Sequence, residues 1–114
     1  MFFELHRQFE ELYNGISEKI DMVAERIKAL STVVRPEHRF SEYLKVSTIE
    51  EKVAGSVPEM IDCVIKDLET IVLIERRIIK EAHAFGDEAT ITMVGEFLVA
   101  DEKSLWMFNA FKQK

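Results

Sequence analysis

The first thirty residues carry one uninterrupted amphipathic pattern. Apolar side chains recur every three or four positions, and no proline interrupts them: Leu5, Phe9, Leu12, Ile16, Ile20, Val23, Ile27 and Leu30. This spacing follows the helical period and predicts a helix over roughly residues 2–31. Gly15 is its weak position, because glycine inside a helix costs about 1 kcal/mol relative to alanine. Either the rest of the helix absorbs this cost, or another backbone comes close there.

The rest of the chain is also predicted to be helical. Pro36 ends the first pattern within a loop at 32–40, and residues 41–47 are expected to form a short helix that crosses to the next long one. Ser56, Pro58 and Glu59 have the spacing of a helix start with a capping box.

The third segment is expected to run to about Ala84 and to stop before Gly86. Asp87 is expected to cap a last helix that ends near Lys112. Trp106, inside that last helix, is expected to pack in the core or in an interface. The prediction is an all-α fold of three long helices plus the short crossing helix.

Size and charge narrow the classes of function. The chain has 114 residues, which favours one domain, and its net charge of −6 argues against a free-standing binder of nucleic acid. Its single cysteine, Cys63, has no partner for an internal disulfide or a zinc motif, so a reducing cytoplasm is the expected location. No apolar run reaches transmembrane length, and we expect no membrane contact.

A polar stripe runs along the first helix, well away from its apolar stripe. His6 is followed four residues later by Glu10, and Asp21 is followed four residues later by Glu25. Asn14 and Ser17 lie between the two pairs, whereas Arg7, Lys19 and Arg26 lie off the centre line. A solvated helix face is the plain explanation. A solvated helix face usually mixes charge signs, whereas the centre of this stripe holds only side chains that can bind a metal ion or are uncharged. This difference favours a second explanation.

The second explanation is a metal site shared between two chains. Side chains four residues apart on a helix can reach one ion. His6 and Asp21 are separated by about 22 Å along the axis at 1.5 Å per residue, so one chain cannot gather both pairs. A second copy packed antiparallel, with a two-fold axis near residues 15 and 16, brings His6 and Glu10 opposite Asp21 and Glu25.

Several segments resemble the Dps family, the miniferritins that protect DNA during starvation. The likeness runs through FFELHRQFEELYNGISEKIDMVAERI, SEYLKVSTIEE, FGDEAT and DEKSLWMFNAF. It implies a ferritin-like bundle and a dodecameric shell that oxidises and stores iron. It also implies that His6, Asp21 and Glu25 are ligands of an iron oxidation site across a dimer interface, with Glu10 as an acidic auxiliary ligand.

The resemblance breaks at the start of the chain. The family has an earlier helix with a further histidine ligand, and the chain begins where that helix is already complete. We therefore expect residues 1–114 to be a single truncated ferritin-like domain whose iron site lacks one imidazole. Weaker iron binding and slower oxidation are the expected result.

Two functions remain open at this point. The first is a ferroxidase and iron-storage protein that protects DNA against oxidative stress, with direct DNA contact unsupported by the charge. The alternative is a non-catalytic helical oligomerisation protein that keeps its assembly surface without a working iron site.

Overall fold

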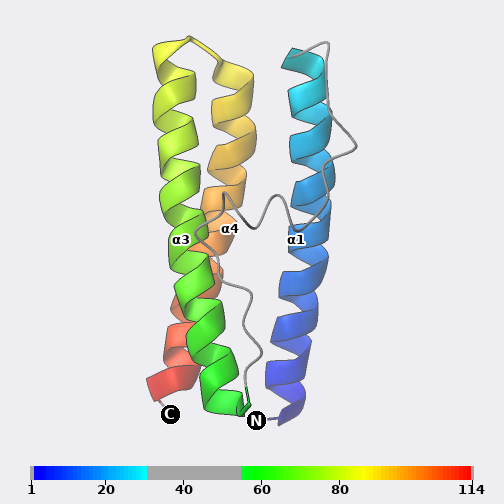
Figure 1. Ribbon diagram of the computed structural model, residues 1–114, viewed down its shortest axis with the longest axis vertical. Coiled ribbons are helices and arrows are strands. Elements are labelled where there is room, and N and C mark those ends of the chain that lie inside the picture. Colours follow the sequence, from blue (N-terminus) through cyan, green and yellow to red (C-terminus); the bar gives the residue numbers. More distant parts are fainter. Residues whose placement is uncertain (1, 31–54, 114) are drawn as a thin grey trace. The chain divides into compact units, whose positions relative to one another are not determined.

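The computed structural model describes residues 2–30 and 55–113, and all its regular structure is helical. Helix α1 spans Phe2–Leu30, α3 spans Val57–Ala84 and α4 spans Glu88–Gln113 (Figure 1). The three predicted long helices are confirmed, and no strand occurs in these described ranges. The short helix predicted at 41–47 lies outside them.

The chain divides into two compact units, Met1–Glu37 and His38–Lys114. Helix α1 belongs to the first unit, whereas α3 and α4 form the second. None of the described helices is long and apolar enough to cross a lipid bilayer.

Local signals in the sequence set both ends of α3. Ser56 has extended backbone angles, and its Oγ accepts a hydrogen bond from the backbone N–H of Glu59 at 3.3 Å. The Glu59 carboxylate in turn accepts from the N–H of Gly55 at 2.9 Å, one residue before the N-cap, whereas the predicted capping box has it accept from Ser56. At the other end, Gly86 has φ +69°, a left-handed conformation that glycine adopts without strain. The predicted start and stop of this helix are confirmed.

Asp87 caps α4, as predicted. Its Oδ1 accepts a hydrogen bond from the backbone N–H of Thr90 at 3.2 Å, and its Oδ2 accepts one from the Thr90 hydroxyl. Glu88 follows in the first turn, where a carboxylate is favoured by the helix dipole. The turn between α3 and α4 is therefore only a few residues long, which makes the two helices antiparallel neighbours.

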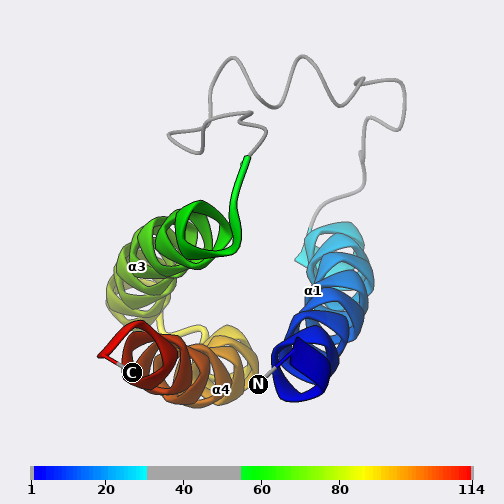
Figure 2. The ribbon, with the colours of Figure 1, turned by 90° about the horizontal axis from the view of Figure 1, so that it is seen from below.

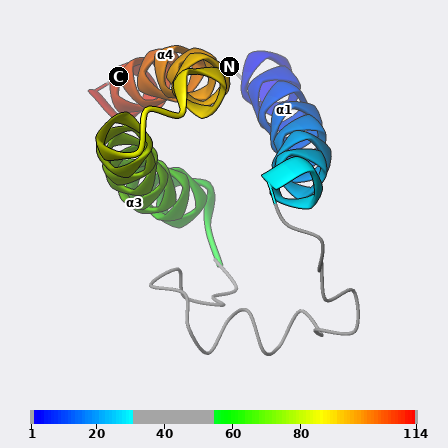
Figure 3. The same ribbon diagram turned by 90° about the horizontal axis from the view of Figure 1, so that it is seen from above.

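Helices α3 and α4 pack side by side along their length (Figures 2 and 3). Each contributes a buried stripe that advances by three or four residues: Ile61, Ile65, Leu68, Val72 and Ala82 from α3, and Val94, Phe97, Phe108 and Phe111 from α4. Two ion pairs join the helices outside this core. Arg76 meets Glu102 at 2.9 Å, and Asp62 meets Lys112 at 3.1 Å. These pairs tie the two helices together in one antiparallel register.

Two acidic residues lie within the buried stripes, where sequence periodicity alone predicts apolar side chains. Glu75 of α3 is 5% exposed and Asp101 of α4 is 2% exposed. Glu75 directly precedes Arg76, and Asp101 directly precedes Glu102. Because Arg76 and Glu102 form an ion pair, Glu75 and Asp101 lie at the same level along the two helices. Both take part in polar interactions.

The α3–α4 core predicts that two leucines of α3 contribute very differently to the free energy of unfolding. Leu68 is 2% exposed and Leu73 is 64% exposed. Leu68→Ala should lower the free energy of unfolding by about 2–5 kcal/mol, because it removes buried methyl groups and leaves a cavity. Leu73→Ala should change it by less than about 0.5 kcal/mol. Urea unfolding of both variants tests this, and equal losses would contradict the assignment of the core.

Replacement by alanine is expected to change the stability of the protein in opposite directions at two glycines. Gly86→Ala should destabilise the protein by roughly 1–2 kcal/mol, because a β-carbon is disfavoured in the left-handed conformation. Gly15→Ala should stabilise it by about 1 kcal/mol, because Gly15 is helical and a β-carbon there meets no described atom within 4 Å. Thermal unfolding measures both. A loss of stability in Gly15→Ala would show that another group approaches this position closely.

Candidate metal centre

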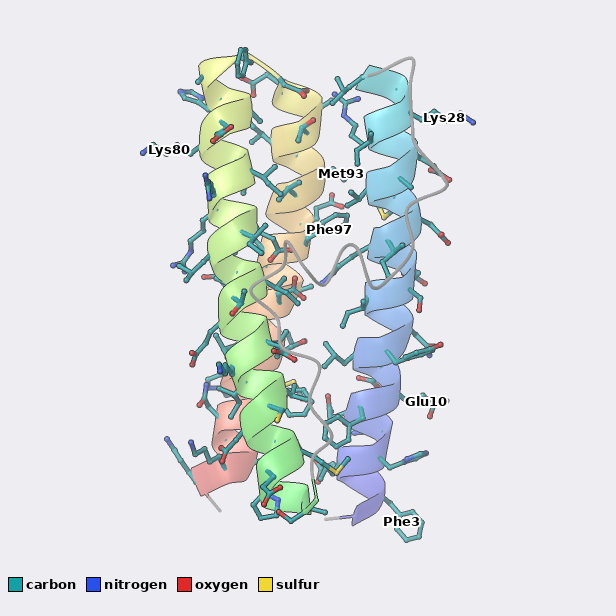
Figure 4. The ribbon with its side chains drawn as sticks, viewed as in Figure 1. Phe3, Glu10, Lys28, Lys80, Met93 and Phe97 are labelled. Atoms are coloured by element: carbon teal, nitrogen blue, oxygen red, sulfur yellow. The ribbon has the colours of Figure 1, made fainter. Side chains whose placement is uncertain are left out.

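Helix α1 carries the four predicted ligands along one side. The helix is continuous from Phe2 to Leu30, so its period fixes their directions. His6, Glu10, Asp21 and Glu25 are all exposed. Figure 4 shows Glu10 projecting from α1 on the same side as Phe3 and Lys28, near the two ends of the helix. We call this side the polar stripe; it comprises His6, Glu10, Asn14, Ser17, Asp21 and Glu25.

Each end of the polar stripe is a pair with helical i, i+4 spacing, which places one side chain above the other. His6 and Glu10 form the first pair, and Asp21 and Glu25 form the second. Arg7 is next to His6 in the sequence, and its Nε lies 4.0 Å from a carboxylate oxygen of Glu11, on the flank of the stripe. One imidazole and three carboxylates are thus the candidate metal ligands of the two pairs.

One cation was overlooked from the sequence. Lys28 lies seven residues after Asp21 and three after Glu25, so it is in line with the polar stripe just beyond its second pair. The stripe therefore holds no lysine or arginine between His6 and Glu25, but it ends at a lysine.

A single chain does not bring the four ligands together. On a straight helix, His6 and Asp21 stay separated by about 22 Å. Within the described residues, no group of three or more histidine, cysteine, aspartate or glutamate side chains is placed to hold a metal ion. As candidate metal ligands, the two pairs are therefore at most half-sites, and a metal ion would need further ligands from another source.

Glu75 and Asp101 are the other acidic residues that a search for metal ligands must consider. Both are buried in the α3–α4 pair, and sequence reasoning missed them. Their burial was indicated by the sequence, because both residues continue the spacing of three and four positions that the buried apolar residues follow. Two carboxylates alone are not a complete metal site, and the described residues supply no third ligand there. The α1 half-sites remain the candidate.

Comparisons with known proteins identify the family. The ferritin-like domain family matches residues 1–114. The DNA protection during starvation protein of Porphyromonas gingivalis is 41% identical over 118 residues, which cover 99% of this chain and 70% of that protein. DNA protection during starvation protein 2 of Bacillus anthracis is 35% identical, over 96% of this chain and 75% of its own length.

Solved structures agree. Dps from Staphylococcus aureus superposes with a TM-score of 0.86 at 31% identity, over 97% of this chain and 74% of that one. The Dps protein of Vibrio cholerae, described as a member of a superfamily of ferritin-like diiron-carboxylate proteins, gives 0.84 at 37% identity, over 96% and 69%. The ferritin-like fold expected from the resemblance is confirmed, and the chain belongs to the Dps family of ferritin-like proteins.

Proposed function

We propose that this protein binds Fe(II) between two copies of α1, oxidises it there and stores the ferric product. The observation that carries the proposal is the arrangement of the polar stripe. It presents two exposed half-sites, one with an imidazole and a carboxylate and one with two carboxylates, about 22 Å apart on a rigid helix. Family membership supports the same chemistry.

An antiparallel pair of α1 helices completes both half-sites at once. With the two-fold axis between Gly15 and Ile16, residues whose numbers add up to 31 face each other. His6 then faces the partner's Glu25, and Glu10 faces the partner's Asp21. The contact is isologous, so it creates two equivalent sites.

The same axis gives favourable pairs outside the metal ligands. Asn14 faces the partner's Ser17, and these two side chains can exchange hydrogen bonds. Phe3 faces the partner's Lys28, and an ammonium group against an aromatic ring is attractive. The lysine at the end of the polar stripe thus falls opposite an exposed ring instead of a metal ligand. This agreement at positions that bind no metal is independent support for the register.

The ligand set suits iron. Hard carboxylate oxygens together with one imidazole favour iron over copper(I), and the absence of a cysteine among the four excludes a thiolate site. His6 would bind through a neutral imidazole nitrogen. Asp21 and Glu25 would bind through carboxylates, which can bridge two ions. Glu10 would be an auxiliary acidic ligand.

Iron is the substrate in this proposal, and the protein supplies ligands and geometry. Each Fe(II) loses one electron on oxidation. Two of these electrons, with two protons, reduce one molecule of hydrogen peroxide to two molecules of water; dioxygen as oxidant needs four electrons and four protons. The carboxylates favour the Fe(III) product because they place negative charge beside the higher positive charge.

Protection of DNA follows from this chemistry without direct contact. Removing Fe(II) and peroxide together removes the reactants that damage DNA. The net charge of −6 gives no electrostatic reason for the described helices to bind a polyanion. Cytoplasmic location stays a prediction based on the single cysteine.

Substitution of the ligands tests the site. Asp21→Asn combined with Glu25→Gln should weaken Fe(II) binding in calorimetry by at least about tenfold, because it removes two anionic ligands. Ferric absorbance after addition of peroxide should then rise no faster than in buffer. Glu11→Gln is the matched control, because this exposed carboxylate lies on α1 outside the polar stripe. Wild-type protein that fails to bind Fe(II) would favour the non-catalytic oligomerisation protein instead.

Mixing two inactive variants tests whether the site is shared. His6→Ala lacks the imidazole, and Asp21→Asn with Glu25→Gln lacks the carboxylates, but a mixed dimer contains one complete site. Random exchange of chains should restore about a quarter of the wild-type sites, because half of the dimers are mixed and each has one intact site of two. Ferric absorbance measures the recovery. No recovery after refolding the variants together would contradict a site between chains.

A further inference from the structure

Helix α1 contains the dipeptide Asn14-Gly15, which is not among the candidate ligands of the iron site. Asn14 is exposed, and its side-chain amide has no hydrogen bond to any described residue. The chain has one other asparagine, Asn109 of α4, which is half-buried and precedes Ala110. The amide nitrogen of Asn109 donates to the backbone oxygen of Leu105 at 3.0 Å. The two asparagines therefore differ in exposure, in partners and in the residue that follows.

An asparagine followed by glycine can react with its own backbone. The backbone nitrogen of Gly15 attacks the side-chain carbonyl carbon of Asn14, and a bond forms between this nitrogen and Cγ. The bond from Cγ to the amide nitrogen breaks, and ammonia leaves with the proton of the Gly15 nitrogen. Water then opens the cyclic imide at either carbonyl, so the product is aspartate or isoaspartate. Glycine favours this attack because it has no side chain beside the attacking nitrogen.

The helical conformation of α1 opposes this reaction. Within the helix, the N–H of Gly15 donates to the carbonyl oxygen of Glu11, which keeps the nitrogen away from the Asn14 side chain. The reaction therefore needs a local opening of the helix. Gly15 makes the opening easier, since glycine gains more backbone freedom on leaving a helix than other residues do. Its β-carbon position meets no atom within 4 Å apart from the adjoining backbone, so no described side chain packs over this point.

The charges around Asn14 make the helix sensitive to loss of the amide. Glu10 and Glu18 lie four residues from Asn14, Glu11 lies three residues from it, and all three carboxylates are exposed. Arg7 lies 4.0 Å from Glu11 and offsets part of its charge. A carboxylate at position 14 would repel these glutamates, and like charges at such spacings destabilise a helix. Deamidation would therefore weaken α1 at the position where it opened.

We propose that Asn14 is a site of spontaneous deamidation, and that the reaction proceeds through local opening of α1 at Gly15. The aspartate product adds a negative charge to the middle of the polar stripe. The isoaspartate product lengthens the main chain by a methylene group between residues 14 and 15, so it interrupts the ladder of helical hydrogen bonds there. Water is the only co-reactant, and nothing is oxidised or reduced.

The consequence for iron rests on the function proposed above. The pairs His6–Glu10 and Asp21–Glu25 lie on opposite sides of position 14, and the continuous helix keeps them in line. An interruption between residues 14 and 15 removes the fixed separation and direction on which an antiparallel contact depends. A deamidated chain should therefore lose the shared site, although all four ligands stay chemically intact.

Peptide mapping by mass spectrometry tests the modification. The full chain is held below its unfolding midpoint at mildly alkaline pH, and the same chain unfolded in guanidinium chloride gives the rate without a helix. Trypsin places the two asparagines in separate peptides, 8–19 and 104–112. Acid should accumulate at Asn14 in the folded chain while Asn109 stays an amide. A folded chain that keeps the Asn14 amide while the unfolded chain converts, or an equal rate at Asn109, would overturn the proposal.

Two variants test the role of the dipeptide. Gly15→Ala should slow the conversion by more than about fivefold, because its methyl group hinders the attack and the helix opens less readily. Asn14→Gln keeps a neutral amide but would have to form a larger ring, so it should not convert in the same period. Conversion of Gly15→Ala at the wild-type rate would contradict an opening that depends on Gly15.

Ageing of the protein separates deamidation from the proposed iron chemistry. Circular dichroism of aged wild-type protein should show a loss of helical content, and Fe(II) oxidation should fall in proportion to the isoaspartate formed. Aged Gly15→Ala should keep the helical content and the rate of its own fresh sample. Fresh wild-type protein that does not oxidise Fe(II) would contradict the proposed function, whereas the mass and helix measurements still decide the deamidation. Oxidation that survives complete conversion to isoaspartate would overturn the link between the intact helix and the site.

Discussion

A rigid helix cannot bring its two ends together, and this limits how the candidate ligands of the protein can meet. Helix α1 holds His6 and Glu10 near one end and Asp21 and Glu25 near the other, about 22 Å apart. A metal ion binds within about 2–2.5 Å of each ligand, so no motion of one straight helix joins the two pairs. The antiparallel copy that we propose would place the missing half of each site opposite the existing half. In that proposal, ligand geometry and assembly become one property of this helix.

The second unit shows how one helix can present two apolar sides. Helix α4 buries Val94, Phe97 and Phe108 against α3 and exposes Val99 and Trp106 on its other side. The buried side holds the pair together with help from ion pairs at its edge. The exposed side has no role in that pair.

Local features of the fold were predictable from the sequence, and non-local ones were not. The caps at Ser56 and Asp87 and the stop at Gly86 depend on neighbouring residues only, and the structure confirms them. The burial of Glu75 and Asp101 depends on how α3 meets α4. Trp106 was expected in the core or in an interface, and its exposure excludes the core of the described helices. Apolar residues lie on all sides of α4, so only the position of α3 decides which side becomes the core. The candidate ligands came from spacing and family resemblance, and their meeting across a two-fold axis stays a prediction.

The most direct test is a crystal structure of the protein soaked in Fe(II), with anomalous scattering measured on both sides of the iron absorption edge. Iron peaks are expected between two antiparallel α1 helices, each bounded by His6 from one chain and by Asp21 and Glu25 from the other. Iron bound by residues of one chain only, or α1 helices that bind no iron and face no copy of themselves, would contradict a site shared between chains.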